Sequence, residues 1–95
     1  MPAIGLLTLE LKLEHCHSLK DKRHWVRGLK DRLRHAHNVA VSEVADQDLW
    51  QSSIICAITV SPSRQRAAQV LEAAEAASAA FLGPYLVSAT IDWLE

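Results

Sequence analysis

The first residues whose chemistry stands out form a His-Cys-His run near the start of the chain, His15, Cys16 and His17. Imidazole and thiolate are zinc ligands, and a thiol beside an imidazole can act as a nucleophile with its base. A structural zinc site usually takes four ligands, however, and Cys56 falls within an apolar run elsewhere. Adjacent residues also seldom present both catalytic groups to one substrate. We therefore expect no metal site, no catalytic residues and no cofactor.

A second candidate site is the Asp-x-Asp pair of Asp46 and Asp48. Carboxylate oxygens bind hard cations, but such a cation takes more oxygen ligands than two side chains supply. Aspartate is also common in turns, because its side chain bonds to the nearby backbone. We interpret this pair as part of a turn and predict no metal ion there.

Lysine and arginine residues form the densest cluster of charged groups in the sequence. Seven of the ten Lys and Arg residues fall between Lys20 and Arg34, and the segment 17–37 carries 7 − 2 = +5 charges. The rest of the chain carries 3 − 9 = −6, which gives the formal net charge of −1. Such an uneven distribution of charge along a chain that is near-neutral overall indicates an anionic partner.

On a helical wheel, five of these cations form one row, which we call the basic row. It consists of Lys20, Arg23, Arg27, Lys30 and Arg34, spaced 3, 4, 3 and 4 residues apart. Such a row can meet successive phosphates of a nucleic acid. The alternative is a solvated face that keeps the protein soluble. Few acids are interleaved, and some cations lie at the helix N-terminus, where the dipole disfavours them, so we favour phosphate binding.

Lys22 differs from these cations because it falls on the apolar side of the same helix, between Leu19 and Val26. A buried ammonium needs a polar partner. Asp46 and Asp48 are the candidates, because the predicted hairpin brings them to the start of the helix. We predict a structural ionic cluster of Lys22, Asp46 and Asp48.

Hydropathy periodicity predicts the elements that position these residues. Period-2 alternation indicates strands over residues 4–14, 52–60 and 85–93, and a short β-branched run indicates another over 39–44. Ser18 and Asp21 form a capping signal for a helix that ends near His37. Ser61 and Pro62 predict the start of a second helix, whose apolar stripe ends at Gly83.

The order β-α-β-β-α-β predicts a ferredoxin-like α+β fold, with a four-stranded antiparallel sheet and two helices on one face. We expect one domain over residues 1–95. Segments 15–23, 46–51 and 83–85 should meet at one end of the sheet. No aromatic pair stands on the open sheet face, so it is not an RRM-like platform. An apolar patch on that face, which we assign to Ile4, Leu6, Ile55 and Ala57, could form a homodimer.

The first thirteen residues are apolar but lack a basic leader, so we expect neither a signal peptide nor a membrane span. Two cysteines do not make a disulfide framework. We predict a bacterial, cytoplasmic protein with reduced thiols.

Two motifs, His17-Ser-Leu-Lys-Asp-Lys-Arg23 and Asp46-Gln-Asp-Leu-Trp-Gln51, resemble the YlxP-like family of small bacterial proteins. The resemblance covers essentially the whole chain and implies a ferredoxin-like fold. The family has no established activity, so it supplies no catalytic residues. Its genes tend to lie among genes for transcription termination and translation initiation, which implies a link to the ribosome. Cys16 between two histidines departs from the family pattern.

Together these patterns predict a non-enzymatic RNA- or ribosome-associated factor that binds phosphate backbone through the basic row. The alternative is a homo-oligomeric protein-interaction or small-ligand-binding module that uses the open sheet face. An enzyme would require Cys16, His17 or the Asp46 and Asp48 pair to act in turnover, and no substrate suggests itself.

Overall fold

Four strands and two long helices follow one another in the order that the periodicity predicts. The computed structural model describes residues 2–94, so residues 1 and 95 of the expected domain lie outside it. The strands are β1 (Ala3–Lys12), β2 (Ala40–Ala45), β3 (Ser52–Ser61) and β4 (Leu86–Leu94). The helices are α1 (Leu19–Ala36), α2 (Arg64–Leu82) and the short 3-10 helix η1 (Gly83–Tyr85).

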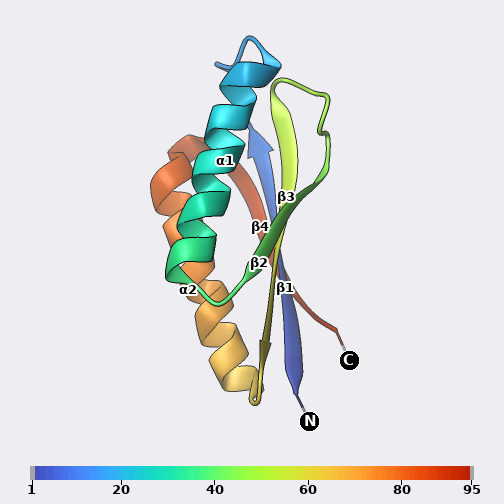
Figure 1. Cartoon of the computed structure of the whole chain (residues 1–95), viewed down its shortest axis with the longest axis vertical. Coiled ribbons are helices and arrows are strands. Elements are labelled where there is room, and N and C mark those ends of the chain that lie inside the picture. Colours follow the sequence, from blue (N-terminus) through green and yellow to red (C-terminus); the bar gives the residue numbers. More distant parts are fainter. Residues whose placement is uncertain (1, 95) are drawn as a thin grey trace.

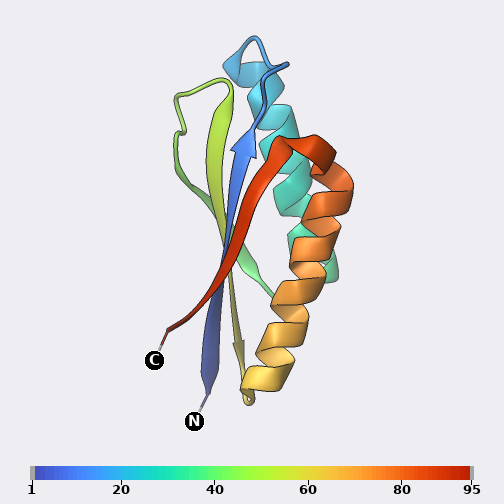
Figure 2. The same cartoon turned by 180° about the vertical axis from the view of Figure 1, so that it is seen from behind.

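The strands form one antiparallel sheet in the order β2-β3-β1-β4. Both long helices cover the same face of this sheet and leave the other face open (Figures 1 and 2). The predicted ferredoxin-like α+β arrangement is confirmed. The central positions belong to β1 and β3, which carry the longest apolar alternations.

The core lies between the helices and the sheet. Its buried side chains include Leu7, Leu9 and Leu11 from β1, Val26, Leu29 and Leu33 from α1, and Ala67, Leu71 and Ala74 from α2. Small residues on α2 allow a close approach to β1, and Gly5 sits under that helix. A Cβ built at Gly5 would lie 2.6 Å from Leu71 Cδ1 and 2.9 Å from Trp93 Cζ3, so any side chain at this position would force these two side chains to move.

The start of α1 is capped as the sequence predicts. Ser18 Oγ accepts a hydrogen bond from the Asp21 backbone N–H at 3.1 Å, and Asp21 Oδ2 accepts one from the His17 N–H at 3.0 Å. The first bond satisfies a backbone donor that the first helical turn leaves free, and the second ties the residue before the N-cap to the helix.

The second helix begins later than predicted. Its N-cap is Ser63, whose Oγ accepts from the Arg66 N–H at 3.1 Å. Ser61 is instead the last residue of β3, where it pairs with Ala3, so sheet pairing extends past the expected cap. The helix does end at Gly83, whose φ of 56° lies in the left-handed region that glycine tolerates best.

The assignment of Ile55 and Ala57 to the open sheet face is wrong. Both are fully buried beneath the helices, because Ala57 pairs with Leu7 and Ile55 pairs with Leu9 across the ladder. Directly opposite residues share a face, and the β1 leucines face the helices. The β3 residues on the open face are Ile54, Cys56, Ile58 and Val60. Both faces of β3 are apolar, so alternation alone could not orient the strand.

Candidate functional site

Three segments far apart in sequence meet at one end of the sheet, as the topology predicts. Gln51 Nε2 donates to the carbonyl oxygens of Glu14 and Cys16, at 3.0 Å each. The ring of His15 stacks on Tyr85 with centroids 4.4 Å apart. Figure 1 shows the start of α1 beside the connection between β2 and β3 at this end. The second sequence motif, through Gln51, is thus bonded to the segment that directly precedes the first motif.

Lys22 points inward from α1 and is 1% exposed. Its Nζ lies 2.9 Å from Glu43 Oε2 and also donates to the backbone carbonyl of Asp46. The same Glu43 oxygen accepts from the buried Ser53 hydroxyl at 2.6 Å. The inward position of Lys22 is confirmed, but the predicted carboxylate partners are wrong. Asp46 contributes only its carbonyl, and Asp48 is exposed and outside the cluster.

The turn after β2 explains why Asp46 binds through its backbone. Asp46 has a φ of 63°, in the left-handed region that aspartate tolerates, and its carbonyl also accepts from the Leu49 N–H at 3.0 Å. Glu43 was the missed partner. The sequence could have identified this partner, because Glu43 lies two residues after Val41 and so shares the buried face of the strand.

Cys16 is not arranged as a nucleophile. The side chain is fully buried, and this burial raises the pKa of the Cys16 thiol, with Asp21 adding to the rise and Lys22 opposing it. His15 Nε2 lies 3.9 Å from the sulfur, but its ring packs on Trp25 and Tyr85. Within residues 2–94, no three His, Cys, Asp or Glu side chains cluster closely enough to hold a metal ion.

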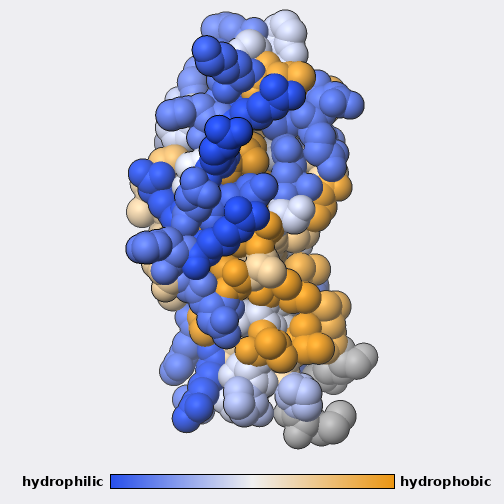
Figure 3. Space-filling view, in the orientation of Figure 1, coloured by the Kyte–Doolittle hydropathy of each residue, from blue (hydrophilic) through white to orange (hydrophobic). Residues whose placement is uncertain are grey.

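The basic row lies along the outer side of α1, where hydrophilic side chains dominate the surface (Figure 3). Lys20, Arg23, Arg27 and Arg34 are exposed, and Lys30 is partly buried. A hollow of about 350 Å³ runs beside the row; it is lined by Arg23, Val26, Arg27, Lys30, Asp31, Arg34 and Glu43. Glu43 thus belongs both to this hollow and to the Lys22 cluster.

Members of the basic row differ in what they contact. Arg34 Nη2 donates to the Val41 carbonyl at 3.1 Å and so ties α1 to β2. In the described part of the chain, the side chains of Arg23, Arg27 and Lys30 have neither an ion pair nor a hydrogen bond. Lys20 lies apart, at a hollow that it shares with His15 and Trp25.

Arg32, which the helical wheel places away from the basic row, has its own contacts. Its guanidinium carbon lies 3.9 Å from the centroid of the Phe81 ring, and its Nη1 donates to the Gly28 carbonyl at 3.3 Å. This cation–π contact joins the two long helices. Arg32 is therefore held by contacts within the protein.

Fold and surface together define a ferredoxin-like α+β protein with a basic helix face. The sequence matches the model of the DUF503 family, proteins of unknown function, over residues 4–91, and the chain belongs to this family. The matched region includes both sequence motifs and the whole basic row. No curated protein matches the chain. No helix in residues 2–94 is both long and apolar enough to cross a membrane.

Proposed function

We propose that this protein is a non-enzymatic RNA-binding factor of the ribosome, which holds phosphate backbone on the basic row of α1. The observation that carries the proposal is the row of exposed or partly exposed cations beside one hollow, of which Arg23, Arg27 and Lys30 are unpaired among the described residues. Unpaired guanidinium groups keep their donors free for a bidentate phosphate contact.

The spacing of the row suits a linear polyanion. The helix rises about 1.5 Å per residue, so the row from Lys20 to Arg34 extends about 21 Å in steps of about 5 Å. A single small anion would engage only one or two of these side chains. A phosphate chain would engage most of them at once and release its counterions, which makes affinity strongly dependent on salt.

The row carries an energetic cost in the free protein. Like charges three or four residues apart repel by about 0.2–0.5 kcal/mol per pair. Lys20 and Arg23 also lie in the first turns of α1, where the helix dipole disfavours cations. A bound anion would relieve both terms, whereas a row kept only for solubility would gain from interleaved acids.

The choice of ribosomal RNA as the anion rests on the resemblance to the YlxP-like family and its gene neighbourhood. The sheet offers no alternative site for bases: along the central strands the open face carries Thr8, Glu10, Cys56 and Ile58, with no aromatic pair for stacking. We therefore expect contacts to phosphates more than to bases, and weak sequence preference.

The test measures affinity for structured ribosomal RNA as a function of salt. Lys20→Glu, Arg23→Glu and Arg27→Glu combined should abolish binding at moderate salt. If each cation meets one phosphate, the slope of log K against log salt should also fall by about 2–3.

The chain offers a charge-matched control. Lys12, Arg64 and Arg66 are the three cations outside α1, and reversing all three makes the same change in net charge. This control should keep most of the affinity. Equal losses in both variants would show a response to net charge alone. Wild-type protein that neither binds RNA nor sediments with ribosomal subunits at low salt would also reject the proposal.

A further inference from the structure

The open sheet face carries a contiguous apolar surface, the open-face patch, at the end of the sheet near the chain termini. It consists of Ile4, Leu6, Ala40, Ile58, Val60 and Leu94. The ladder makes these residues neighbours, because Ile4 pairs with both Val60 and Leu94, and Ile58 pairs with both Leu6 and Ala40. Figure 3 shows hydrophobic residues gathered over the lower ends of the strands, away from the hydrophilic surface of α1.

Three large side chains of the patch are well exposed: Val60 by 58%, Leu94 by 45% and Ile58 by 38%. Single exposed aliphatic residues are common on protein surfaces, but a contiguous group on a flat sheet face marks an interaction surface. We propose that the open-face patch binds a second copy of this chain, so that two sheets pack face to face in a two-fold dimer.

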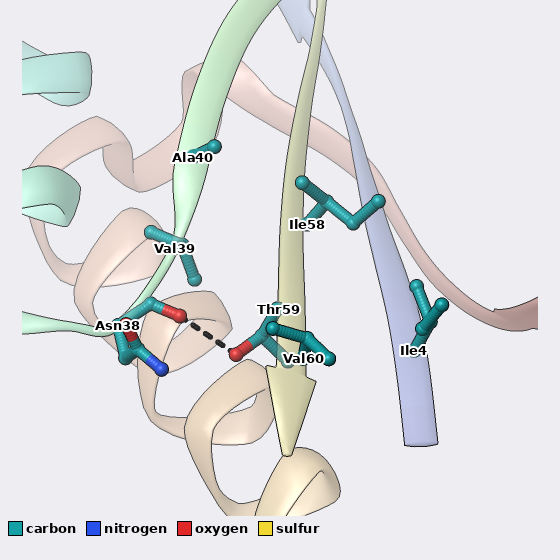
Figure 4. Close-up of a pocket in the computed structure, with 7 residues that line it drawn as sticks. All are labelled: Ile4, Asn38, Val39, Ala40, Ile58, Thr59 and Val60. Atoms are coloured by element: carbon teal, nitrogen blue, oxygen red, sulfur yellow. Dashed lines mark hydrogen bonds between the residues drawn. The ribbon is translucent and has the colours of Figure 1, made fainter. Parts of the chain in front are cut away.

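A hollow beside the patch provides a place for a side chain of the second copy. It lies where β2 separates from β3 and is lined by Ile4, Asn38, Val39, Ala40, Ile58, Thr59 and Val60 (Figure 4). The Thr59 hydroxyl donates to the Asn38 carbonyl at 2.6 Å, so the buried hydroxyl is already satisfied. The remaining wall is largely aliphatic and suits an aliphatic occupant.

Symmetry identifies that occupant. A two-fold axis that runs between β1 and β3, parallel to both, brings β4 of one copy over β2 of the other. Leu94 lies at the same level of the sheet as Ile4 and Val60, which is the level of the hollow. Leu94 of each copy would then enter the hollow of the other, as an isologous interface requires.

Charge also favours a second copy. No residue of the open-face patch is charged, but Asp92 on the edge strand β4 pairs with Leu6 and so borders the patch; the other charged residues on the open face within residues 2–94 are Glu10 and Lys12, toward its far end. An uncharged surface needs no complementary charges, so the patch is compatible with itself. In the two-fold arrangement proposed above, Asp92 would lie over Ala40 of the second copy at the edge of the interface, where polar groups are common.

The available area is of the right order for a dimer. The four strands have 10, 6, 10 and 9 residues; at a rise of about 3.3 Å per residue and a spacing of about 4.8 Å they present a plane of about 550 Å² before side-chain relief. Stable interfaces bury about 800 Å² per partner. Both long helices lie on the opposite face, so pairing of the sheets leaves the basic row of each copy exposed.

The test determines the mass of the full chain by sedimentation equilibrium, from about 1 to about 100 μM. The wild type should reach twice its mass of 10.5 kDa, and Ile58→Asp should remain a monomer. Leu49→Asp is the matched control, because Leu49 is 53% exposed but lies in the connection between β2 and β3. A monomeric wild type, a dimer that survives Ile58→Asp, or a dimer that Leu49→Asp also breaks would overturn the proposal.

Cys56 supplies a second measurement on the native chain. It lies on the open face opposite Thr8 and is partly exposed, whereas Cys16 is fully buried. Alkylation of Cys56 by iodoacetamide should slow as the wild-type concentration rises and stay fast in Ile58→Asp. A wild-type rate that does not change with concentration would contradict the proposal. If Ile58→Asp fails to fold by circular dichroism, Leu94→Asp at the end of the edge strand takes its place.

Discussion

Lys22 and Glu43 form an ion pair of 2.9 Å that joins α1 to β2 beneath the surface of the domain. Glu43 also lines the hollow beside the basic row, so one carboxylate belongs to the structural cluster and to the candidate anion site. The pair therefore sets the position of α1 against the sheet, and with it the direction in which the basic row faces.

Lys22→Met should destabilise the fold strongly. The change leaves the Glu43 carboxylate without its cation and the Asp46 carbonyl without its lysine donor, and breaking a buried pair on one side costs about 3–5 kcal/mol. Urea unfolding would measure this loss. Asp48→Asn is the control, since Asp48 is exposed and outside the cluster, and it should change stability by less than about 0.5 kcal/mol. Equal stabilities for the two variants would contradict the assigned cluster.

Gln51→Ala should loosen the end of the sheet where the segments meet. The variant loses two hydrogen bonds to the carbonyls of Glu14 and Cys16, each of about 0.5–1.5 kcal/mol. Thermal unfolding should show a lower midpoint, and hydrogen exchange should quicken around residues 14–16. Gln47→Ala, at an exposed position in the same turn, should leave both measurements unchanged.

Gly5→Ala should lower the free energy of unfolding by about 1–3 kcal/mol, because the new methyl group would lie 2.6 Å from Leu71 Cδ1 and 2.9 Å from Trp93 Cζ3 and would force these packed side chains to move. Gly28→Ala makes the same chemical change in α1. Its methyl group meets Phe81 Cζ at 3.1 Å, but alanine gains about 1 kcal/mol of helix propensity. Denaturant unfolding should therefore give Gly5→Ala a clearly lower free energy of unfolding than Gly28→Ala. The reverse order would contradict the packing described between α2 and β1.

Arg27→Gln and Arg34→Gln should separate binding from stability. Arg27 has no partner among the described residues, so its loss should weaken RNA binding and change the free energy of unfolding by less than about 0.5 kcal/mol. Arg34→Gln also removes the hydrogen bond to the Val41 carbonyl and should lower the free energy of unfolding by about 0.5–1 kcal/mol. RNA titrations and urea unfolding of both variants would test this difference. The prediction fails if Arg27→Gln lowers the free energy of unfolding as much as Arg34→Gln does.

The stability of the fold should fall at high pH in part through Cys16. Because the pKa of this thiol is raised in the folded protein, both folded and unfolded states are protonated below the ordinary pKa of about 8.5 and stability is unaffected there. As the pH rises further, the unfolded state ionises first and stability declines. Cys16→Ala should show a shallower decline of stability above about pH 8.5 in urea melts, and identical slopes would contradict burial of the thiol.

Local patterns predicted most of the elements because each rests on interactions between neighbouring residues. The alternation of Leu7, Leu9 and Leu11 identified β1, and Ser18 with Asp21 identified the start of α1. The prediction that Ser61 caps α2 was wrong: serine followed by proline is a common helix start, but pairing with Ala3 keeps Ser61 in β3. A competing long-range contact decided that boundary.

The basic row was visible in the sequence because a helix repeats every 3.6 residues and needs no partner to define its faces. The same periodicity placed Lys22 on the inner side. It could not name the partner, since that depends on a bulge between Glu43 and Ala45 and on the left-handed turn at Asp46. These backbone features turned the Asp46 carbonyl, and not its carboxylate, toward the ammonium.

The sequence by itself determined the order of elements and the cationic side of α1, because propensity, capping and hydropathy period are local properties, and that order was enough to predict the ferredoxin-like topology. Only the tertiary structure decided which face of β3 is buried and which acid meets Lys22. Both faces of β3 are apolar, so the register against β1 placed Ile55 and Ala57 inside and left Ile58 and Val60 outside. Residues that pair across a sheet share a face whatever their own alternation suggests.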